Sequence, residues 1–231
     1  MRFFREEDLL LSVKQDVTGA FAPPKPARRR LSLEDRERQI LDKAIEFFSE
    51  HGLSGQMREL ARSAGITHAL LYHYFPTKQA LIERVYLDLF EGRWKQEYEV
   101  MLDAPGVDPV EKIIAFYWEY FDAVLTREFV RIYIFSGLTD HYIPDRFVSL
   151  LHIRLFPRLI RESRKLRGSV SRGKATDAEF EHLMGLHGGI FHTSMRRFVY
   201  EQNYGPVRNR YDRKFIEARV RAYAASLPFA V

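Results

Sequence analysis

The segment from Thr67 to Lys78, THALLYHYFPTK, concentrates side chains that suit an anionic partner: two tyrosines, two histidines and a lysine. A tyrosine hydroxyl can donate a hydrogen bond to a phosphate oxygen while its ring lies against a sugar or a thymine methyl group. A small residue such as Ala69 lets a helix approach the major groove of DNA closely. The segment is therefore a candidate DNA surface. The alternative is that Tyr72 and Tyr74 pack between helices and expose only their hydroxyls.

A second group of reactive side chains consists of His182, His187 and His192, which recur every five residues. Five residues turn an α-helix by about 140°, so one helix face cannot present all three to a metal ion. We expect His187 and His192 to satisfy polar positions in an interface or pocket instead. The sequence also has no cysteine, no HExxH motif, no phosphate-binding glycine motif and no carboxylate pair in a catalytic setting. We therefore expect neither an enzyme nor a bound cofactor.

The composition is typical of a globular protein. The chain has 231 residues, of which 46% are hydrophobic and 29% charged, enough to bury one large core or two modest ones. No apolar run approaches the roughly 18 residues that span a bilayer, and cysteine is absent, so we expect a cytoplasmic protein without a membrane partner. The net charge of +5 permits nucleic acid as a partner without requiring it.

An N-terminal extension, residues 1–31, precedes the regular helical pattern. Residues 1–17 could form a short amphipathic helix, which the proline-rich linker TGAFAPPKPA at 18–27 would end. The arm Arg28, Arg29 and Arg30 follows, and it either lies along a minor groove of DNA or is a solvated linker. From Ser32 onward the pattern is helical, and no alternating run is long enough to predict a strand. The predicted fold is therefore all-α.

Three helices are predicted between Ser32 and Phe75. Ser32 is placed to cap a helix over 33–51, and Gly52 is placed to end it. Gly65 is placed to end the next helix in the same way. A second helix is expected over 56–64, and a third begins at Thr67. Leu71 and Phe75 are four residues apart and should both face the core. This arrangement predicts a helix-turn-helix unit.

At these residues the sequence resembles the TetR family of transcriptional repressors. The resemblance covers about residues 36–90 and rests on Arg58-Glu59-Leu60-Ala61, Gly65, Tyr72-His73-Tyr74-Phe75 and Thr77-Lys78, in that order. It implies a helix-turn-helix DNA-binding domain at 32–80 and a helical ligand-binding and dimerisation domain at 81–231. The predicted DNA-binding residues are Gln56, Thr67, His68, Ala69, Tyr72, His73, Tyr74 and Lys78.

The second domain is expected to begin with a linking helix from Lys78 to about Glu99. Five helical segments should follow, at 110–125, 128–138, 145–167, 177–201 and 213–227. The resemblance implies that such helices enclose a small-molecule pocket and that the last two form a homodimer. Apolar residues on two faces of 177–201, together with Gly185, Gly188 and Gly189, favour close packing by a neighbouring helix there.

The effector site is predicted from the density of aromatic residues. A largely apolar cavity would suit a small, largely apolar effector molecule. Its predicted lining is Tyr117, Tyr120, Phe121, Tyr133, Ser136, His141, Phe147, Leu151 and His187. The alternative is that the aromatics fill the core. A basic run, Arg158, Arg161, Arg164, Lys165, Arg167, Arg172 and Lys174, is either a second nucleic-acid surface or a solvated helix end.

Together with these patterns, the resemblance to the TetR family implies a ligand-responsive transcriptional repressor that binds a pseudo-palindromic, double-stranded DNA operator as a homodimer. The competing interpretation is a helical small-molecule-binding or protein-interaction module without specific DNA binding. An enzyme ranks third.

Overall fold

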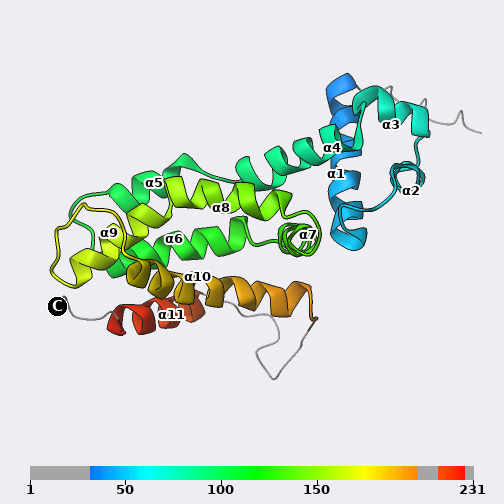
Figure 1. The fold of residues 1–231 in the computed structure, drawn as a ribbon. Helices are drawn as coiled ribbons and strands as arrows, with labels where there is room; N and C mark the ends of the chain where they lie inside the picture. Colours follow the sequence, from blue (N-terminus) through cyan, green and yellow to red (C-terminus); the bar gives the residue numbers. More distant parts are fainter. Residues whose placement is uncertain (1–31, 202–212, 227–231) are drawn as a thin grey trace, which may run out of the picture.

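The computed structural model describes residues 32–201 and 213–226, and this part of the chain is helical and contains no strand. The all-α prediction is confirmed. Figure 1 shows an elongated arrangement in which α1 to α3 form a headpiece at one end, α4 leads away from it, and α5 to α11 form the body. The predicted amphipathic helix at 1–17, the linker at 18–27 and the arginine arm lie outside the described residues.

The headpiece consists of α1 (Leu33–His51), α2 (Met57–Ser63) and α3 (His68–Tyr74). The Ser32 side chain accepts a hydrogen bond from the backbone N–H of Asp35, and Thr67 caps α3 in the same way through the N–H of Leu70. Such caps satisfy backbone donors that have no partner within the helix. Gly65 ends the turn between α2 and α3 with a φ of 65°, a conformation that glycine adopts without steric cost. The predicted helices therefore agree with the structure to within a residue or two.

The linking helix is shorter than predicted. α4 (Lys78–Tyr86) continues into a single π-turn, η2 (Leu87–Glu91), and then stops, so the predicted helix to Glu99 is wrong. The Gly92 N–H donates to the carbonyl of Leu87 at 2.7 Å, which closes the wider turn. Glycine disfavours the helix interior, and a new helix, α5 (Gln96–Asp103), begins only after a break.

The segment predicted as one helix at 145–167 is two. The body helices are α6 (Pro109–Ala123), α7 (Arg127–Gly137), α8 (Tyr142–Arg154), α9 (Phe156–Leu166), α10 (Asp177–Phe198) and α11 (Arg213–Ala225). Pro157 causes the break between α8 and α9, because it lacks an N–H and its ring would clash with the carbonyl of Ile153 in a continuous helix. A capping box between Thr176 and Glu179 starts α10.

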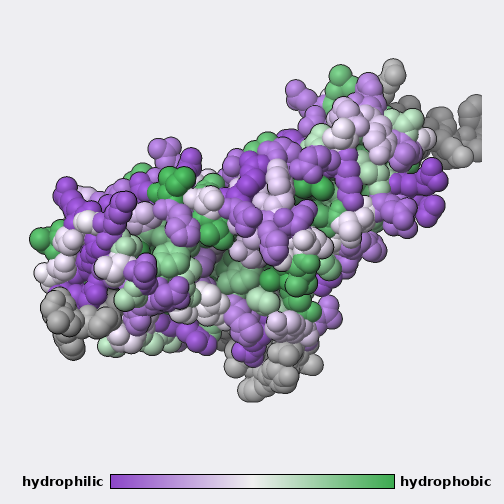
Figure 2. All heavy atoms as spheres, viewed as in Figure 1, coloured by the Kyte–Doolittle hydropathy of each residue, from purple (hydrophilic) through white to green (hydrophobic). Residues whose placement is uncertain are grey.

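The body contacts the headpiece at the end of α1 and also contacts the linking helix α4. Arg131 of α7 donates to the carbonyl of Ser49, at the end of α1, at 2.6 Å and also lies 3.5 Å from Glu50. Arg146 of α8 forms an ion pair with Glu83 of α4 at 2.6 Å and covers the Tyr86 ring at 4.0 Å. One hydrophobic core runs through both parts, and Figure 2 shows that the face in view is mostly hydrophilic, with smaller apolar groups over the body. The contacts of Arg131 and Arg146 place α7 against the headpiece and α8 against α4.

Candidate nucleic-acid interface and effector region

Helix α3 turns one face to the core and the other to solvent. Leu71 is completely buried, and Phe75 just after the helix is 4% exposed. On the opposite side Tyr72 is 38% exposed, and its ring contacts the His68 ring edge to face at a centroid distance of 4.7 Å. Thr67, Ala69 and His73 are also exposed. The structure thus brings these predicted DNA-binding residues onto one short, accessible helix and its cap.

The other predicted DNA-binding residues lie at the margins of this surface. Tyr74 is partly buried against the core, so the packing alternative describes Tyr74 and not Tyr72. Lys78 is the first residue of α4 and is partly buried, which lowers the pKa of its amine. Gln56 is exposed at the N-cap position of α2, and its side chain makes no capping bond.

Sequence reasoning missed two cations on α2. Arg58 and Arg62 are exposed and, among the described residues, make no side-chain hydrogen bond or ion pair, whereas Arg38 and Arg84 are paired with acids. Residues four apart share a helix face, so the spacing of the two arginines could have predicted that they lie together on one face of α2. Unpaired exposed guanidinium groups of this kind are suited to phosphate oxygens.

Part of the predicted effector set converges inside the body. Tyr117 and Tyr120 of α6 are buried and contact His187 of α10, with the Tyr117 hydroxyl 3.3 Å from His187 Nδ1. Burial lowers the pKa of His187 to about 4 and raises the pKa of both tyrosines well above the usual range. The imidazole is therefore neutral at neutral pH and can either accept or donate a hydrogen bond.

The remaining members of the effector set lie elsewhere in the body. Tyr133 and Phe147 contact one another at a centroid distance of 6.3 Å, and Phe121 and Leu151 are buried in the core. Ser136 is buried but already bonded, because its hydroxyl donates to Asp140 and accepts from the Ile143 N–H. His141 is exposed at the start of α8 in a left-handed conformation. The structure does not bring His141 to the aromatic groups.

A cavity of about 850 Å³ lies at the far end of the body from α3, and none of the predicted effector residues lines it. It lies between α9, the loop at 167–175 and the start of α10, and we call it the α9–α10 groove. Several residues of the basic run line this groove. The sequence placed the run on a surface but did not predict a cavity.

The three histidines of α10 have separate environments. His182 stacks on Tyr223, His187 is bonded to Tyr117, and His192 is exposed. In the part of the chain that the structure describes, no group of three or more His, Asp or Glu side chains is placed to hold a metal ion. None of the helices described is both long and apolar enough to cross a membrane.

Comparison with known proteins assigns the headpiece. Residues 40–85 match the family model for bacterial regulatory proteins of the tetR family. The HTH-type transcriptional repressor KstR2 of Mycolicibacterium smegmatis is 33% identical over 109 residues, which are 46% of this chain and 47% of that protein. Residues 40–85 are therefore similar to the DNA-binding region of the TetR family. This is a family of transcriptional regulators, not of enzymes. The chain spans about half the length of the curated relatives it matches.

Solved TetR-family structures match the fold over most of the chain. A TetR-like regulator from Rhodococcus sp. RHA1 aligns with a TM-score of 0.62 and 20% identity, covering 85% of this chain and 97% of that one. The fatty acid degradation regulator FadR from Bacillus halodurans aligns with a TM-score of 0.61 and 14% identity, covering 87% and 100%. The predicted helix-turn-helix followed by a helical domain is the TetR-family fold.

Proposed function

We propose that this protein is a ligand-responsive transcriptional repressor that binds a pseudo-palindromic DNA operator as a homodimer. The observation that carries the proposal is α3, a short helix within the family match whose outer face is formed by exposed His68, Tyr72 and His73. The major groove of DNA is about 12 Å wide and admits one α-helix. Thr67 and Ala69 share this accessible surface, and Ala69 leaves room for close approach.

Cations at the edges of this surface supply contacts to phosphates. We assign this role to Lys78 at the start of α4 and to Arg58 and Arg62 on α2. In the described part of the chain none of the three makes an ion pair, so binding of phosphate would break no existing bond. Gln56 and Tyr74 complete the proposed contact set at the margins.

The DNA test compares Tyr72→Ala with Lys78→Ala in the full chain. We expect Tyr72→Ala to weaken operator binding about tenfold and to change sequence preference, because its ring would lie at base edges. Lys78→Ala should weaken binding to all sequences alike and reduce the salt slope by about one phosphate contact. The measurement is fluorescence anisotropy at several salt concentrations, on duplexes selected from genomic fragments.

Lys95→Ala is the matched control, because it removes one lysine from the body, where Lys95 pairs with Glu119. It should bind DNA like the unaltered protein. Unchanged affinity of both Tyr72→Ala and Lys78→Ala would remove these residues from the interface. If the unaltered protein is not retained on duplex DNA even at low salt, the module without specific DNA binding becomes the better interpretation.

The proposed dimer forms through α10 and α11. Met184, Phe191 and Met195 of α10 are only partly buried. At Gly185, Gly188 and Gly189 an added Cβ would meet no atom within 4 Å, so no helix of the same chain lies against these glycines. Each glycine costs a helix interior about 1 kcal/mol relative to alanine. A second copy packing on this face would account for them, and twofold symmetry would then present two α3 helices to two half-sites about 34 Å apart.

Gly188→Leu tests the dimer. A Cβ at position 188 would meet no atom of the same chain within 4 Å, and replacing glycine should raise helix stability slightly, yet the leucine side chain would block close approach of a second copy. We expect sedimentation velocity to show a shift from dimer to monomer and operator affinity to fall at least tenfold. Ser149→Leu, which places the same side chain on an exposed position of α8, should remain dimeric. A Gly188→Leu protein that sediments as a dimer contradicts this interface.

The proposed effector is a small, largely apolar molecule that acts through the aromatic body. Tyr117, Tyr120 and His187 supply an apolar surface with few hydrogen-bonding atoms. FadR from Bacillus halodurans, which shares the fold, is named for fatty acid degradation, which agrees with an apolar effector. A ligand changes DNA affinity only as far as it prefers one arrangement of body and headpiece, and the contacts of Arg131 and Arg146 would carry that preference.

A further inference from the structure

The α9–α10 groove has one apolar wall. Phe156, Ile160 and Phe180 line it, and the rings of Phe156 and Phe180 meet edge to face at a centroid distance of 5.5 Å. The Phe156 ring also contacts the His187 ring at 5.5 Å. Phe156 thus lines the groove and also contacts His187, which is bonded to Tyr117. The apolar wall is therefore adjacent to the buried polar pair of the body.

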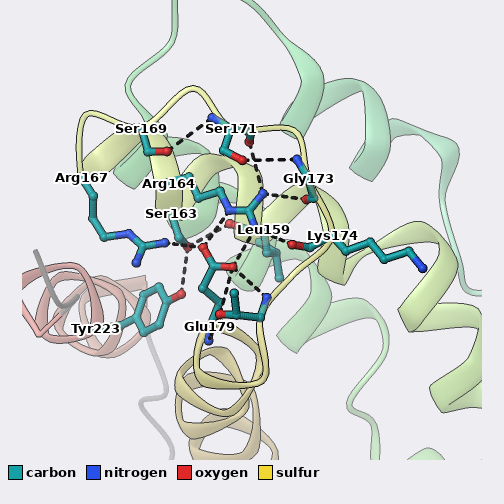
Figure 3. A network of polar contacts seen from close by, with 11 residues as sticks. Leu159, Ser163, Arg164, Arg167, Ser169, Ser171, Gly173, Lys174, Glu179 and Tyr223 are labelled. Carbon is teal, nitrogen blue, oxygen red and sulfur yellow. Dashed lines mark hydrogen bonds and ion pairs between the residues drawn. The ribbon is translucent and has the colours of Figure 1, made fainter. Parts of the chain in front are cut away.

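The loop at 167–175 forms another part of the groove's rim, and a buried arginine holds this loop in place. Arg164 of α9 donates to the carbonyl oxygens of Ser171 at 3.2 Å, Gly173 at 2.8 Å and Lys174 at 2.9 Å. It also forms two bonds of 2.7 Å with the Glu179 carboxylate. Figure 3 shows these bonds converging on the Arg164 guanidinium, with the loop wrapped around it. The loop's own serines add two longer bonds, because Ser169 and Ser171 accept from the backbone N–H groups of Ser171 and Gly173 at 3.3 Å.

The charge of the groove is positive. Its lining contains five Lys or Arg side chains and one acid, Asp103. Arg161 pairs with Asp103 and Lys165 with Glu162, while Arg164 is occupied by the loop. Arg172 and Lys174 remain. Both line the groove, and their charged groups make no ion pair or hydrogen bond with the described residues.

We propose that the α9–α10 groove binds an amphipathic monoanion, with its apolar body against Phe156, Ile160 and Phe180 and its carboxylate or sulfonate at Arg172 and Lys174. The volume of about 850 Å³ is within the range of small-molecule sites. Charge alone would attract phosphates, and the apolar wall alone would attract neutral molecules, so both features together select one ligand class. A regulatory role for this site rests on the proposed repressor function, whereas binding at the site does not.

The experiment uses two fluorescent probes that share one ring system. 1-Anilinonaphthalene-8-sulfonate carries a sulfonate that N-phenyl-1-naphthylamine lacks. We expect the full-length protein to bind the sulfonate probe at least tenfold more tightly. Arg172→Gln combined with Lys174→Gln should lower the affinity for the sulfonate probe about tenfold and change the affinity for the neutral probe less than twofold. Lys43→Gln combined with Lys95→Gln removes the same charge from exposed positions outside the groove and should change neither.

Val170→Glu provides a second variant without loss of core packing, because Val170 lines the groove and is 90% exposed. The new carboxylate should lower the affinity for the sulfonate probe and leave the midpoint temperature of thermal unfolding unchanged. Dodecanoate should displace the sulfonate probe, and glucose 6-phosphate should not. Equal affinity for both probes, or equal effects of the two double variants, would overturn the proposal.

DNA retention measured with and without probe separates the two proposals. Probe binding that depends on Arg172 and Lys174, without any DNA binding by the protein, would support the site and refute the repressor function. If the protein binds DNA but the groove substitutions do not change its affinity for the probe, the groove site alone is refuted.

Discussion

Replacing Lys112 with methionine is expected to lower the free energy of unfolding by about 3 kcal/mol. Lys112 of α6 is 2% exposed and Glu162 of α9 is fully buried, and their charged atoms lie 3.2 Å apart. The lysine also donates to the carbonyl oxygen of Leu102, at the end of α5, at 3.1 Å. Methionine would remove both bonds and leave a buried carboxylate with weaker compensation. Urea denaturation followed by circular dichroism measures the loss.

Two comparisons identify the cause. Lys95→Met breaks an exposed pair with Glu119, and it should cost less than about 1 kcal/mol because water screens such pairs. Lys112→Met combined with Glu162→Leu removes both buried charges, and much of the lost stability should return. The return should be incomplete, because Lys165 loses its partner Glu162. A Lys112→Met protein within 0.5 kcal/mol of the unaltered chain would show that Lys165 and Arg161 alone compensate Glu162.

The pair of Lys112 and Glu162 marks a limit of sequence reasoning. The helices α1 and α3 could be placed because their signals are local: Ser32 and Thr67 cap within three residues, and Gly52 and Gly65 lie in the turns after α1 and α2. The ion pair joins residues 50 apart, and neither sequence neighbourhood shows that both side chains are buried. Only the packing of α6 on α9 creates the pair.

The functional surfaces follow the same division. The exposed face of α3 could be predicted, since burial of Leu71 and Phe75 fixes which side remains outside. The effector set was chosen by residue type, and it divides between the Tyr117 contacts and the Tyr133 contacts, with His141 in solvent. Helical spacing gives the face of each residue but not which helix lies opposite.

The basic run agrees only in part with the solvated alternative, because Lys165, Arg172 and Lys174 are exposed while other members are not. It was expected to be a nucleic-acid surface or a solvated helix end. Arg164 is 7% exposed, and Arg158 and Arg161 pair with Asp103. Acids from α5 and α10 approach the run only in the folded chain. The charge that remains for a ligand is therefore much smaller than the sequence indicates.

Glu179→Gln is expected to lower the free energy of unfolding at pH 7 by about 3 kcal/mol. The Glu179 carboxylate is bonded to Arg164 and Arg167 and accepts from the Thr176 N–H in the capping box of α10. Glutamine would leave two largely buried guanidinium groups without a counter-charge. Arg164 would be held less firmly without the carboxylate, and the loop carbonyls that it bonds could then shift. The affinity of the groove for the sulfonate probe should therefore fall although Glu179 does not line the groove.

The pH dependence separates the charge of Glu179 from its packing. Its two arginine partners hold the pKa of the Glu179 carboxyl well below its usual range. Stability from such a group is fully present above the unfolded pKa of about 4.3 and is lost as pH falls toward the folded value. The difference between the unaltered chain and Glu179→Gln should therefore be constant from pH 8 to about pH 5 and should shrink below pH 4.

His187 adds a second acid-sensitive contribution, because its pKa of about 4 lies below the unfolded value of about 6.5. It lowers stability as pH falls below about 6.5 in both proteins alike, so it cancels in the difference. Urea denaturation at one-unit steps from pH 3 to pH 8 gives that difference directly. A difference that stays constant to pH 3 would show that the substitution acts through altered hydrogen bonding in the capping box, and the carboxylate charge would then not be what holds the rim of the groove.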